Sequence, residues 1–590
     1  MTAPTATDPA EADLLTRLLS TLLREDVVGL RSRSTLVHRP DGRWLRLGAD
    51  GLHALLLPVT DDGYQGTYAA RLPLLLREPD GRELTSCTAV LAALRERAEH
   101  IDHGGFDALA EECRQTLTTV RLHTDTAEEC ATRLVDQYGK DPADWTGLAK
   151  GLAHDTLAAR LDHPVYPTAR GRSGLTEHQL RAYAPEFHPH FALRWLAVPR
   201  DALTLGGGGL PASLPSPAAV GLPALDHTHA LLPVHPLTVG ATLERALHDT
   251  GLAGRAFLAG PARLDAVPTL SMRTVALTDD PALHLKLPLA TATLGLRNRR
   301  TIKPGTLVDG AAGQRLLETV IAREPRFQGT VLHADESAYA HAGHELLAAL
   351  CRRHPAGLED SVVLPMAALL AEAPGGRLVI DHLADRFHDG DPLALLDDCL
   401  TLLLDWQTTL FGYGIALESH QQNISLILDR SPGGTTRLRL LLKDNDGPRV
   451  HTPRLRERLG DDAPGPDAFD DARILCRDDE GPADLFTTIT VHLCAGAYAF
   501  GLARHGRAHL PMLLGLVRDR LDEALTRLGG APAATLRARV LDAPELPVKA
   551  MITAGTLLTK QRSGAADINK HYTTGPNYLR ADLMTPGERR

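Results

Sequence analysis

Apolar residues recur at helical spacing along the first quarter of the chain. In the runs at 12–25 and 88–101, leucine, alanine and valine return every three or four residues, which is typical of amphipathic helices. A strand-like apolar run at 43–59 interrupts this pattern. Residues 1–150 are therefore predicted to be mostly helical.

The pattern changes after residue 150. A loop rich in glycine, proline and serine occupies 205–223, where no helix can run, and strand-like runs follow it up to about residue 300. Helical spacing returns from about residue 340, and at 392–411 leucines line one apolar face. We expect an α+β protein of three regions, 1–150, 151–340 and 341–590.

A strand-like stretch at 412–428 (GYGIALESHQQNISLIL) carries a cluster of polar side chains between apolar flanks. A buried polar group without a partner costs roughly 1–3 kcal/mol, so a structural network or a ligand must satisfy these groups. The run at 435–447 is predicted to return as the second strand of a hairpin, which would bring Asp444 beside Asn423 and Glu418. Their oxygen atoms suit Mg²⁺, and a capping network at the strand end explains the pattern equally well.

A second hairpin is predicted at 268–289, where two strand-like runs flank the turn sequence TDDP. Folding the chain about this turn places Arg273 opposite Lys286 and Ser271 near Pro288. Two like charges that face each other destabilise a sheet, whereas an anion between them reverses the effect. A register shift of one residue would instead send the two side chains to opposite faces. We favour the anion-binding interpretation.

The segment at 162–174 (DHPVYPTARGRSG) is stiffened by two X-Pro steps and then presents Arg170 and Arg172. In an extended chain these two guanidinium groups share a face and suit a ligand that bears carboxylates. An ordinary surface loop could have the same sequence. The basic run at 297–303 is either a solvated face or the wall of a site for a polyanion.

Composition narrows the class of partner. The formal net charge of −10 over 590 residues argues against a general binder of nucleic acid or of anionic membranes. No run approaches the ~18 uninterrupted apolar residues of a membrane helix. The seven cysteines, an odd number without a C-x-x-C pair, indicate a reducing compartment. We therefore expect a cytoplasmic protein without nucleic-acid or membrane partners.

Several motifs occur together in a specific order. They are S-x-R-T at 271–274 with Lys286 after it, T-x-x-x-R at 293–297, G-x-x-x-E-x-H-x-Q-N at 414–423, and a variant of R-D-x-x-G at 443–447. In this order they resemble the IucA/IucC family of NRPS-independent siderophore synthetases over about residues 150–450. The family's H-P-x-H-P-x-x-K-x-R-x-G motif is present at 163–174 with two departures, since Tyr166 replaces a histidine and Arg170 replaces a lysine.

The resemblance implies a fold and a reaction. Such enzymes look like a cupped hand, here with 1–150 as a mostly helical thumb, 151–340 as fingers with the phosphate-binding hairpin, and 341–590 as a palm with the Mg/ATP floor and C-terminal helices. They adenylate a carboxylic acid with ATP and release pyrophosphate, and an amine, hydroxylamine or alcohol then displaces AMP. For this chain the acid is expected to be a di- or tricarboxylate, citrate-like or a monoamide, used in siderophore biosynthesis.

The resemblance also implies roles for individual residues. Catalysis falls to His420, Arg273 and Lys286. The ATP-binding residues would be Ser271, Arg273, Thr274, Lys286, Thr293, Arg297, His420 and Asn423. The Mg²⁺ ligands would be Glu418, Asn423 and Asp444. The acid would be bound by His163, Tyr166, Arg170, Arg172 and Gln422.

Two of these assignments carry alternatives. Arg299 or Arg300 could serve in place of Arg297, because the chain is about one residue shorter than the family pattern there. Tyr166 is expected either to narrow the acid pocket or to pack beneath its loop. The expected partners are ATP, Mg²⁺, a small carboxylic acid and an amine, and we expect the protein to be a homodimer.

Two other functions are open on the sequence. A phosphotransferase is suggested by H-x-x-N at 420–423 followed by Asp444, an order that echoes the Mg²⁺-binding residues of kinases, but no H-R-D or D-F-G sequence is present. The other is a family member that binds a ligand without catalysis, because of the changes at Tyr166 and Arg170. Release of AMP and pyrophosphate rather than ADP separates a synthetase from a phosphotransferase.

Overall fold

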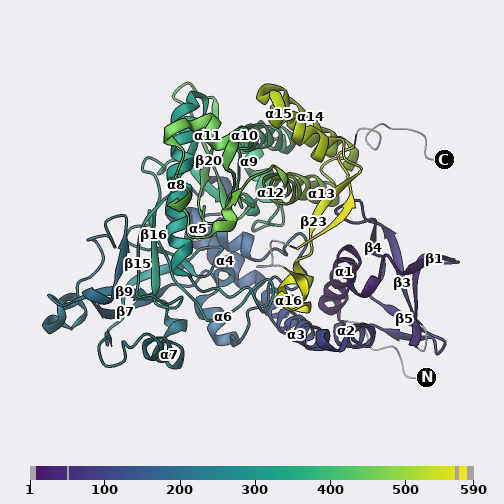
Figure 1. Cartoon of the computed structure of the whole chain (residues 1–590), viewed down its shortest axis with the longest axis horizontal. Coiled ribbons are helices and arrows are strands. Elements are labelled where there is room, and N and C mark those ends of the chain that lie inside the picture. The colour runs from purple at the N-terminus through teal and green to yellow at the C-terminus, as the bar shows by residue number, and fades with distance from the viewer. Residues whose placement is uncertain (1–7, 50–51, 565–570, 581–590) are drawn as a thin grey trace.

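Helices and sheets both build the protein. The computed structural model describes residues 8–49, 52–564 and 571–580. Within these residues the sheets have six, nine, four, three and two strands. Figure 1 shows the nine-stranded sheet on one side of the molecule, the N-terminal sheet on the other, and helices above both. The predicted α+β class is confirmed.

The N-terminal region contains more strands than the sequence indicated. Its antiparallel sheet has the order β1-β2-β3-β5-β6, with β4 paired to β3. The predicted run at 43–59 forms two of these strands, which pair with Leu45 opposite Leu57, and the buried leucines of α1 pack against them. The short outer strands escaped prediction because β1, for example, is mostly exposed and lacks an apolar run.

The N-terminal elements have the following bounds: α1 (Pro9–Arg24), β1 (Ser34–Arg39), β2 (Gly42–Ala49), β3 (Leu52–Asp61), β4 (Tyr68–Ala70), β5 (Leu75–Glu78), β6 (Arg82–Leu84), α2 (Cys87–Arg95), α3 (His103–Asp125) and α4 (Ala127–Tyr138).

The middle of the chain forms the nine-stranded sheet. Its order is β10-β7-β11-β12-β13-β16-β15-β8, with β9 paired to β7. The predicted hairpin at 268–289 supplies β12 and β13 near the centre of this sheet. The elements are α5 (Gly147–Ala159), α6 (Glu177–Tyr183), β7 (Phe191–Pro199), β8 (Thr204–Gly206), β9 (His229–Val234), α7 (Ala241–Asp249), β10 (Phe257–Leu258), β11 (Arg263–Pro268), β12 (Thr274–Leu277), β13 (Leu283–Lys286), α8 (Pro304–Arg323), β15 (Asp335–His341) and β16 (Ala348–Arg353).

The C-terminal region contains a four-stranded sheet of order β14-β20-β19-β17. The predicted hairpin is present, because β19 and β20 pair antiparallel with Ile424 opposite Leu442. The helix predicted at 392–411 is α10 (Pro392–Gly412). Its elements also include β14 (Val331–His333), β17 (Val362–Pro365), α9 (Val379–Phe387), β18 (Ile415–Ala416), β19 (Ile424–Arg430), β20 (Thr436–Leu442), β21 (Arg449–His451), α11 (Thr452–Leu459), β22 (Leu475–Cys476), α12 (Glu480–Leu485), α13 (Ala497–Arg504), α14 (Leu510–Leu528), α15 (Gly530–Leu536), β23 (Glu545–Lys549), α16 (Lys560–Ser563) and β24 (Tyr572–Pro576).

One helical run in the described part of the chain is long and apolar enough to cross a membrane. It spans Glu480–Arg504 through α12, a π-helical segment and α13, and 94% of its apolar window is buried inside the protein. Burial of this extent is that of a core helix. The sequence did not reveal the run because threonines and a histidine interrupt its apolar residues.

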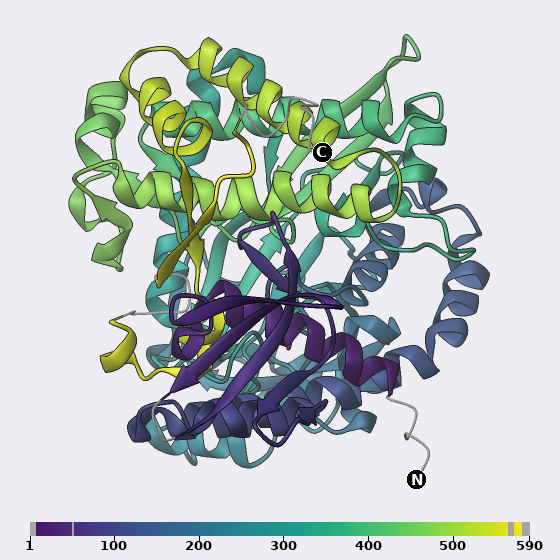
Figure 2. The ribbon, with the colours of Figure 1, turned by 90° about the vertical axis from the view of Figure 1, so that its right-hand side faces the viewer.

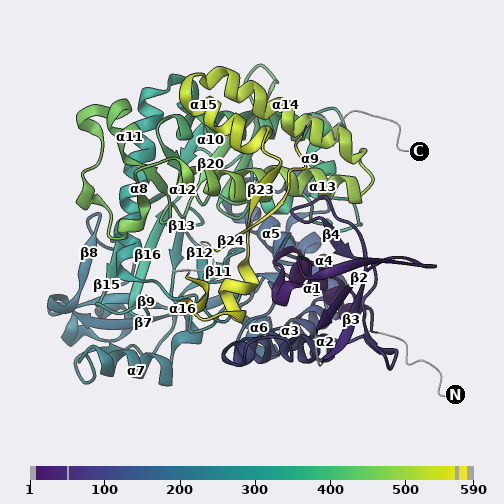
Figure 3. The same ribbon diagram turned by 45° about the vertical axis from the view of Figure 1, so that its right-hand side comes forward.

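The end of the chain returns to its beginning. The π-helical segment Thr553–Leu557, which follows β23, lies beside α1 and α3 in Figure 3. Figure 2 shows the N-terminal sheet in front of this segment with the C-terminal helices above. The carboxylate of Glu25, just after α1, accepts the backbone N–H groups of Ile552 and Thr553 at 3.1 and 2.8 Å. The carboxylate of Glu112 on α3 accepts the Thr556 hydroxyl at 2.6 Å.

Candidate active site

Two hairpins from different sheets meet at the candidate site. Lys286, the last residue of β13, forms an ion pair with Asp444, two residues beyond β20, and its ammonium lies 3.5 Å from Asp446. The Lys286 side chain is only 5% exposed. The hairpin predicted to bind phosphate and the hairpin predicted to bind metal therefore share one buried cluster of charges.

The predicted register of the first hairpin was wrong by one residue. Thr274, not Arg273, lies opposite Lys286. Arg273 comes just before β12, after a bend in which Met272 has a φ of 57°. This bend interrupts strand alternation, so Arg273 still lies within electrostatic reach of Asp444 and Asp446, which oppose the lowering of its pKa by burial.

Arg273 and Thr274 each have a buried polar atom that makes no hydrogen bond within the described residues. One nitrogen of the Arg273 guanidinium donates to the Thr301 carbonyl at 2.6 Å. Among the described residues, Nε of Arg273 and the hydroxyl of Thr274 are buried without a hydrogen-bond partner. Ser271 belongs to the same turn, where its carbonyl accepts the Arg273 N–H at 2.6 Å.

Asp444 is held by positive charge. Burial would raise the pKa of its carboxyl, but Lys286, Arg352 and Arg273 outweigh that effect and hold the pKa well below its ordinary value. The guanidinium of Arg352 is 3.7 Å from the Asp444 carboxylate. Burial raises the pKa of Asp446 despite the neighbouring Lys286. The cluster thus contains one firmly ionised carboxylate and a second that is harder to ionise.

Helix α8 lets the Asp444 turn pack closely. A Cβ at Gly313 would lie 2.4 Å from the Asn445 carbonyl oxygen, which is too near for any side chain. A Cβ at Gly310 would meet Asp446 at an ordinary 3.6 Å. Because Gly313 has no side chain, the turn can sit directly against the helix.

The polar stretch that precedes β19 is a turn, so the prediction of a continuous strand there was wrong. Residues 417–423 lie between β18 and β19. The side-chain amide of Asn423 donates to the Glu418 carbonyl at 3.2 Å, and the Asn423 carbonyl accepts the Lys443 N–H at 3.1 Å. Part of the polar cluster is therefore satisfied by a network within the protein, as the capping alternative required.

His420 in this turn is neutral in the free protein. Burial, with smaller effects from Lys549, Arg300 and Lys443, lowers its pKa to about 4, although Asp444 opposes the shift. Its Nδ1 accepts the N–H of Gln422 at 3.3 Å. The proton of the neutral ring therefore resides on Nε2, so His420 is a neutral hydrogen-bond donor.

His163 lies close to His420. Burial lowers the pKa of His163 to about 3, and His420 is the next contributor, followed by Arg24 and Lys549. The Nδ1 atom of His163 accepts the N–H groups of Val165 and Tyr166 at 3.2 and 3.1 Å. The motif predicted to bind the acid is thus adjacent to the motif predicted to bind the nucleotide, and Lys549 of β23 is near both histidines.

The three candidate arginines after β13 have different surroundings. The Arg297 guanidinium donates to the Ala554 carbonyl at 3.1 Å. Arg299 is 56% exposed and 4.0 Å from Glu345. Burial lowers the pKa of Arg300 to about 9, with Arg273 as the next contributor and Asp444 opposing it. Arg300 is therefore the member of this set that lies in the charged cluster.

Thr293, the other predicted residue of this loop, has its backbone N–H bonded to the Asn298 carbonyl at 3.3 Å. This bond closes the loop that carries Arg297. The turn is also anchored by the N–H of Arg297, which donates to the Gly555 carbonyl at 3.3 Å. Arg297 thus contacts the π-helical segment Thr553–Leu557 through its side chain and its backbone. The contact of Thr293 and Arg297 with ATP stays a prediction.

The predicted acid-binding arginines are both engaged by protein carboxylates. Arg170 is 2.9 Å from Asp162, and Arg172 is 2.9 Å from Glu186, whose side chain is only 1% exposed. The two guanidinium groups therefore belong to separate ion pairs and do not form one open pair of forks. Gln422 is partly buried beside His420.

Tyr166 packs beneath its loop. The ring is fully buried, and its hydroxyl donates to Glu112 at 3.3 Å. Glu112 also accepts the hydroxyls of Thr168 and Thr556 and the N–H of Leu296. This position corresponds to the packing alternative, because the hydroxyl is satisfied within the protein.

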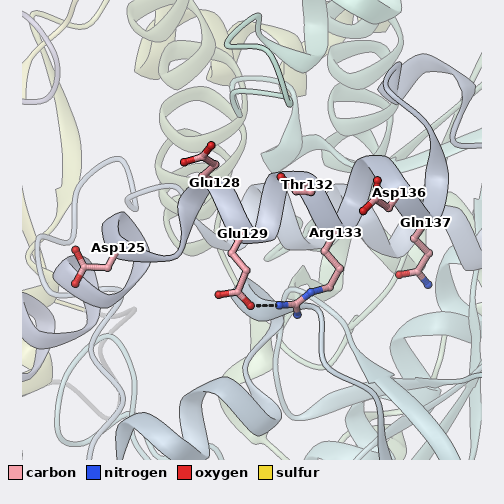
Figure 4. A pocket seen from close by; sticks show the side chains of 7 residues that line it. All are labelled: Asp125, Glu128, Glu129, Thr132, Arg133, Asp136 and Gln137. Atoms are coloured by element: carbon pink, nitrogen blue, oxygen red, sulfur yellow. Dashed lines mark hydrogen bonds and ion pairs between the residues drawn. The ribbon is translucent and has the colours of Figure 1, made fainter.

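The structure has a small cavity at the candidate site and a larger hollow away from it. A cavity of about 10 Å³, roughly one water in size, is bounded by Lys286, Glu336, Asp444 and Asp446. A broad, open hollow of about 790 Å³ lies at the end of α3 and along α4, and Figure 4 shows its side chains, including the ion pair of Glu129 and Arg133 at 2.6 Å. The five other lining residues are Asp125, Glu128, Thr132, Asp136 and Gln137. The carboxylates among them would repel ATP, and none of the lining residues is a predicted site residue.

The donors fit a Mg²⁺ ion that is shared with phosphates. In the described residues no group of three or more His, Cys, Asp or Glu side chains is arranged to hold a metal. Mg²⁺ bound with ATP needs only one or two carboxylates besides the phosphates. Asp444 meets this need, with Asn423 next to it in the paired hairpin and Glu418 packed against Gly447.

Four charged residues of the cluster were not predicted as site residues. Asp446 lies inside the R-D-x-x-G variant at 443–447, at a position that the motif leaves open. Glu336 and Arg352 lie in β15 and β16 and belong to no motif. Lys549 lies in β23, outside residues 150–450 over which the motifs occur. Only the approach of separate strands reveals that these residues are neighbours.

A comparison with known families and proteins agrees with this geometry. The family model described as the IucA / IucC family matches residues 154–371, which include both motifs of the acid and phosphate sites. Residues 154–371 of the chain belong to the IucA/IucC family. A second model, described as a ferric iron reductase FhuF-like transporter, matches residues 396–564.

The chain is also similar to individual proteins. It is 25% identical to staphyloferrin A synthase of Staphylococcus aureus over 327 residues, which are 51% of this chain and 53% of that protein, so the match spans about half of it. Staphyloferrin B synthase of the same organism is 22% identical over 482 residues, with 76% and 77% of the two chains covered. The solved structure of ATP-bound aerobactin synthetase IucA from Klebsiella pneumoniae has a TM-score of 0.68 at 18% identity, covers 96% of this chain and 99% of its own, and shows the same fold.

Proposed function

We propose that this protein is an ATP-dependent synthetase that adenylates a di- or tricarboxylic acid and joins it to an amine, hydroxylamine or alcohol. Membership of the IucA/IucC family makes it a ligase of the siderophore-synthetase type. The observation that carries the finer proposal is the convergence of Lys286, Arg273 and Arg300 on Asp444 beside the neutral His420. The similarity to an ATP-bound aerobactin synthetase supports the use of ATP.

In the first step, a carboxylate oxygen of the acid attacks the α-phosphorus of ATP. A P–O bond to the acid forms, the bond to the β-phosphate oxygen breaks, and pyrophosphate leaves. Negative charge builds up on the phosphate oxygens, and preorganised donors stabilise that charge. Lys286, Arg273 and Arg300 supply cationic donors, and Nε2 of His420 supplies a neutral one.

In the second step, the amine or hydroxyl group attacks the acyl carbon. The carbon–nucleophile bond forms, the acyl–phosphate bond breaks, AMP leaves with the electron pair, and the nucleophile loses a proton to water. His163 lies beside His420 and is neutral, since burial lowers its pKa to about 3. Its Nδ1 is already an acceptor of two backbone N–H groups, so His163 would orient the acid by a hydrogen bond from Nε2.

Mg²⁺ would be held by Asp444, with Asn423 and Glu418 nearby and phosphates completing its coordination. When bound, it neutralises phosphate charge and favours the departure of pyrophosphate. In the free protein Lys286 neutralises Asp444 in its place. Lys286 must therefore exchange a carboxylate partner for a phosphate partner when the nucleotide enters.

The acid site is proposed around His163, Gln422, Arg170 and Arg172. Because Asp162 and Glu186 already pair with the two arginines, the acid would share these guanidinium groups with protein carboxylates. Each guanidinium has five N–H donors, so one bound carboxylate leaves donors available. This arrangement supports selection for an acid with a second, non-reacting carboxylate.

The reaction is tested by incubating the protein with ATP, Mg²⁺, a panel of polycarboxylic acids and hydroxylamine as a surrogate amine. The expected products are AMP and pyrophosphate in equal amounts with an acyl hydroxamate. ADP and inorganic phosphate would instead identify a phosphotransferase, and the absence of ATP–pyrophosphate exchange with every acid would identify a binding protein. The homodimer is a separate proposal, which light scattering of the purified chain tests.

A further inference from the structure

A buried ion pair contacts Asp444. Glu336 of β15 and Arg352 of β16 contact each other, and their side chains are only 3% and 4% exposed. Removing two charges from water is costly unless each is fully paired. Neither residue belongs to a motif, and neither is assigned a role in the reaction described above.

Glu336 contacts the backbone of Asp444. Its two carboxylate oxygens accept the Asp444 N–H at 3.1 and 3.0 Å. The N–H of Glu336 donates to the side-chain oxygen of Gln314 on α8 at 2.7 Å. Glu336 is therefore fixed from both sides before it contacts Asp444.

Arg352 contacts the other end of Asp444. Its guanidinium lies 3.7 Å from the Asp444 carboxylate while it also pairs with Glu336. β16 pairs with β13, so that Leu350 lies opposite Lys286. Arg352 and Lys286 thus approach Asp444 from the same two-stranded support.

Asp444 needs this support because its backbone is unusual. Its φ of 63° lies in the left-handed region, which residues other than glycine seldom occupy. Such conformations persist where the surroundings hold them, and they are common at functional sites. Here the N–H of Asp444 is held by Glu336, and its carboxylate is held by Lys286 and Arg352.

We propose that Glu336 and Arg352 are positioning residues that set the direction of the Asp444 carboxylate for ATP with Mg²⁺. The inference rests on the proposed function, since Asp444 is the residue expected to meet the ion. Partners behind a metal ligand typically change affinity or activity by about 10–100-fold when they are removed. The same loss is expected here for binding of ATP in the presence of Mg²⁺, and a much smaller one in EDTA.

A purely structural role of the pair makes a different prediction, because it acts only through stability. Breaking the pair on one side, as in Glu336→Gln, leaves Arg352 partly unpaired and lowers the melting temperature for either role. The double variant Glu336→Met/Arg352→Met leaves no unpaired charge and keeps the volume similar, so its melting temperature should approach that of the wild type. For positioning residues its affinity for ATP with Mg²⁺ stays low; for a structural pair the affinity recovers with stability.

A matched control lies at the other end of the same β19–β20 hairpin. Arg439 and Asp429 also form a buried pair, at 2.5 Å with side chains 10% and 9% exposed. Asp429 keeps Arg437 as a partner when Arg439 is removed. Arg439→Met should therefore lower the melting temperature without changing the affinity for ATP.

The experiment is calorimetric titration of each full-length variant with ATP, in Mg²⁺ and in EDTA, alongside thermal unfolding of the apo protein. A dissociation constant at least tenfold higher in Mg²⁺ for the double variant, with the control unchanged, supports the inference. A wild-type dissociation constant in the double variant overturns the inference alone. A wild-type protein that binds no ATP under either condition overturns the proposed function and the inference with it.

Discussion

The neutral state of His420 leads to a specific prediction about pH. Burial lowers the pKa of this side chain from the ordinary 6.5 of histidine to about 4. Each tenfold change in acidity corresponds to about 1.4 kcal/mol, so protonation of His420 in the folded protein costs about 3 kcal/mol more than in water. At neutral pH the ring therefore acts as an uncharged donor through Nε2, because Nδ1 accepts the Gln422 N–H.

The perturbation is a pair of substitutions at this position. His420→Ala removes the proposed donor to the α-phosphate and should lower turnover by about 10²–10³-fold, as the loss of one transition-state donor does. His420→Gln keeps an amide N–H and should recover part of this loss. The assay is the rate of AMP release under saturating acid and amine, measured for the three proteins.

The pH profile decides the protonation state. A neutral donor requires no titration of His420 near pH 6.5, so the ratio of wild-type to His420→Gln rates should be constant from about pH 6 to pH 8. A wild-type inflection near 6.5 that is absent from His420→Gln would refute this reasoning, because it would mean that the active ring is protonated.

The same pKa makes a prediction for stability. Because the folded protein holds the pKa of His420 below its unfolded value, its contribution to stability is complete above about pH 6.5 and is lost as the pH falls toward 4. The free energy of unfolding measured with urea should therefore fall more for the wild type than for His420→Gln as the pH is lowered over this interval. An equal dependence of the free energy of unfolding on pH in the two proteins would contradict the lowered pKa of His420.

Three further predictions concern packing and charge around the site. Gly313→Ala should lower the free energy of unfolding by about 1–3 kcal/mol and weaken ATP binding, because its Cβ would lie 2.4 Å from the Asn445 carbonyl oxygen. Gly310→Ala, whose Cβ would lie 3.6 Å from Asp446, should change neither property, and similar urea unfolding curves for the two variants would argue against close packing. Arg300→Ala should raise the KM for ATP at least about tenfold while the exposed Arg299→Ala leaves it unchanged, and equal KM values would remove Arg300 from the site. Tyr166→Phe should lower the melting temperature, since a net hydrogen bond is worth about 1 kcal/mol, with the same preference among acids; a changed preference would restore the pocket-narrowing role.

Elements with a local signal could be predicted from the sequence. The helix at 392–411 and the hairpin of β19 and β20 follow from the spacing of apolar residues and from turn residues between them. The S-x-R-T and E-x-H-x-Q-N motifs identified Arg273 and His420 because their spacing is specific. These features depend on residues close together in the chain, so the sequence contains enough information about them.

The register of β12 with β13 and the conformation of residues 417–423 could not be predicted from the local sequence pattern. The one-residue error between β12 and β13 arises because the bend at Met272 uses a residue before the strand begins, and a shift of one residue changes which side chains face each other. The turn at 417–423 looked like a strand because its flanks are apolar. The six-stranded N-terminal sheet was missed because short, exposed strands have little apolar alternation.

The charged cluster itself was decided only by tertiary structure. Lys286, Asp444, Glu336 and Arg352 come from segments up to 158 residues apart, and their contacts form when β13, β15 and β16 approach the end of β20. The strength of these ion pairs depends on burial, since the same charges in water would attract one another only weakly. The sequence therefore determined which residue types were available for phosphate chemistry, and the packing of two sheets determined which of them meet and in what state of charge.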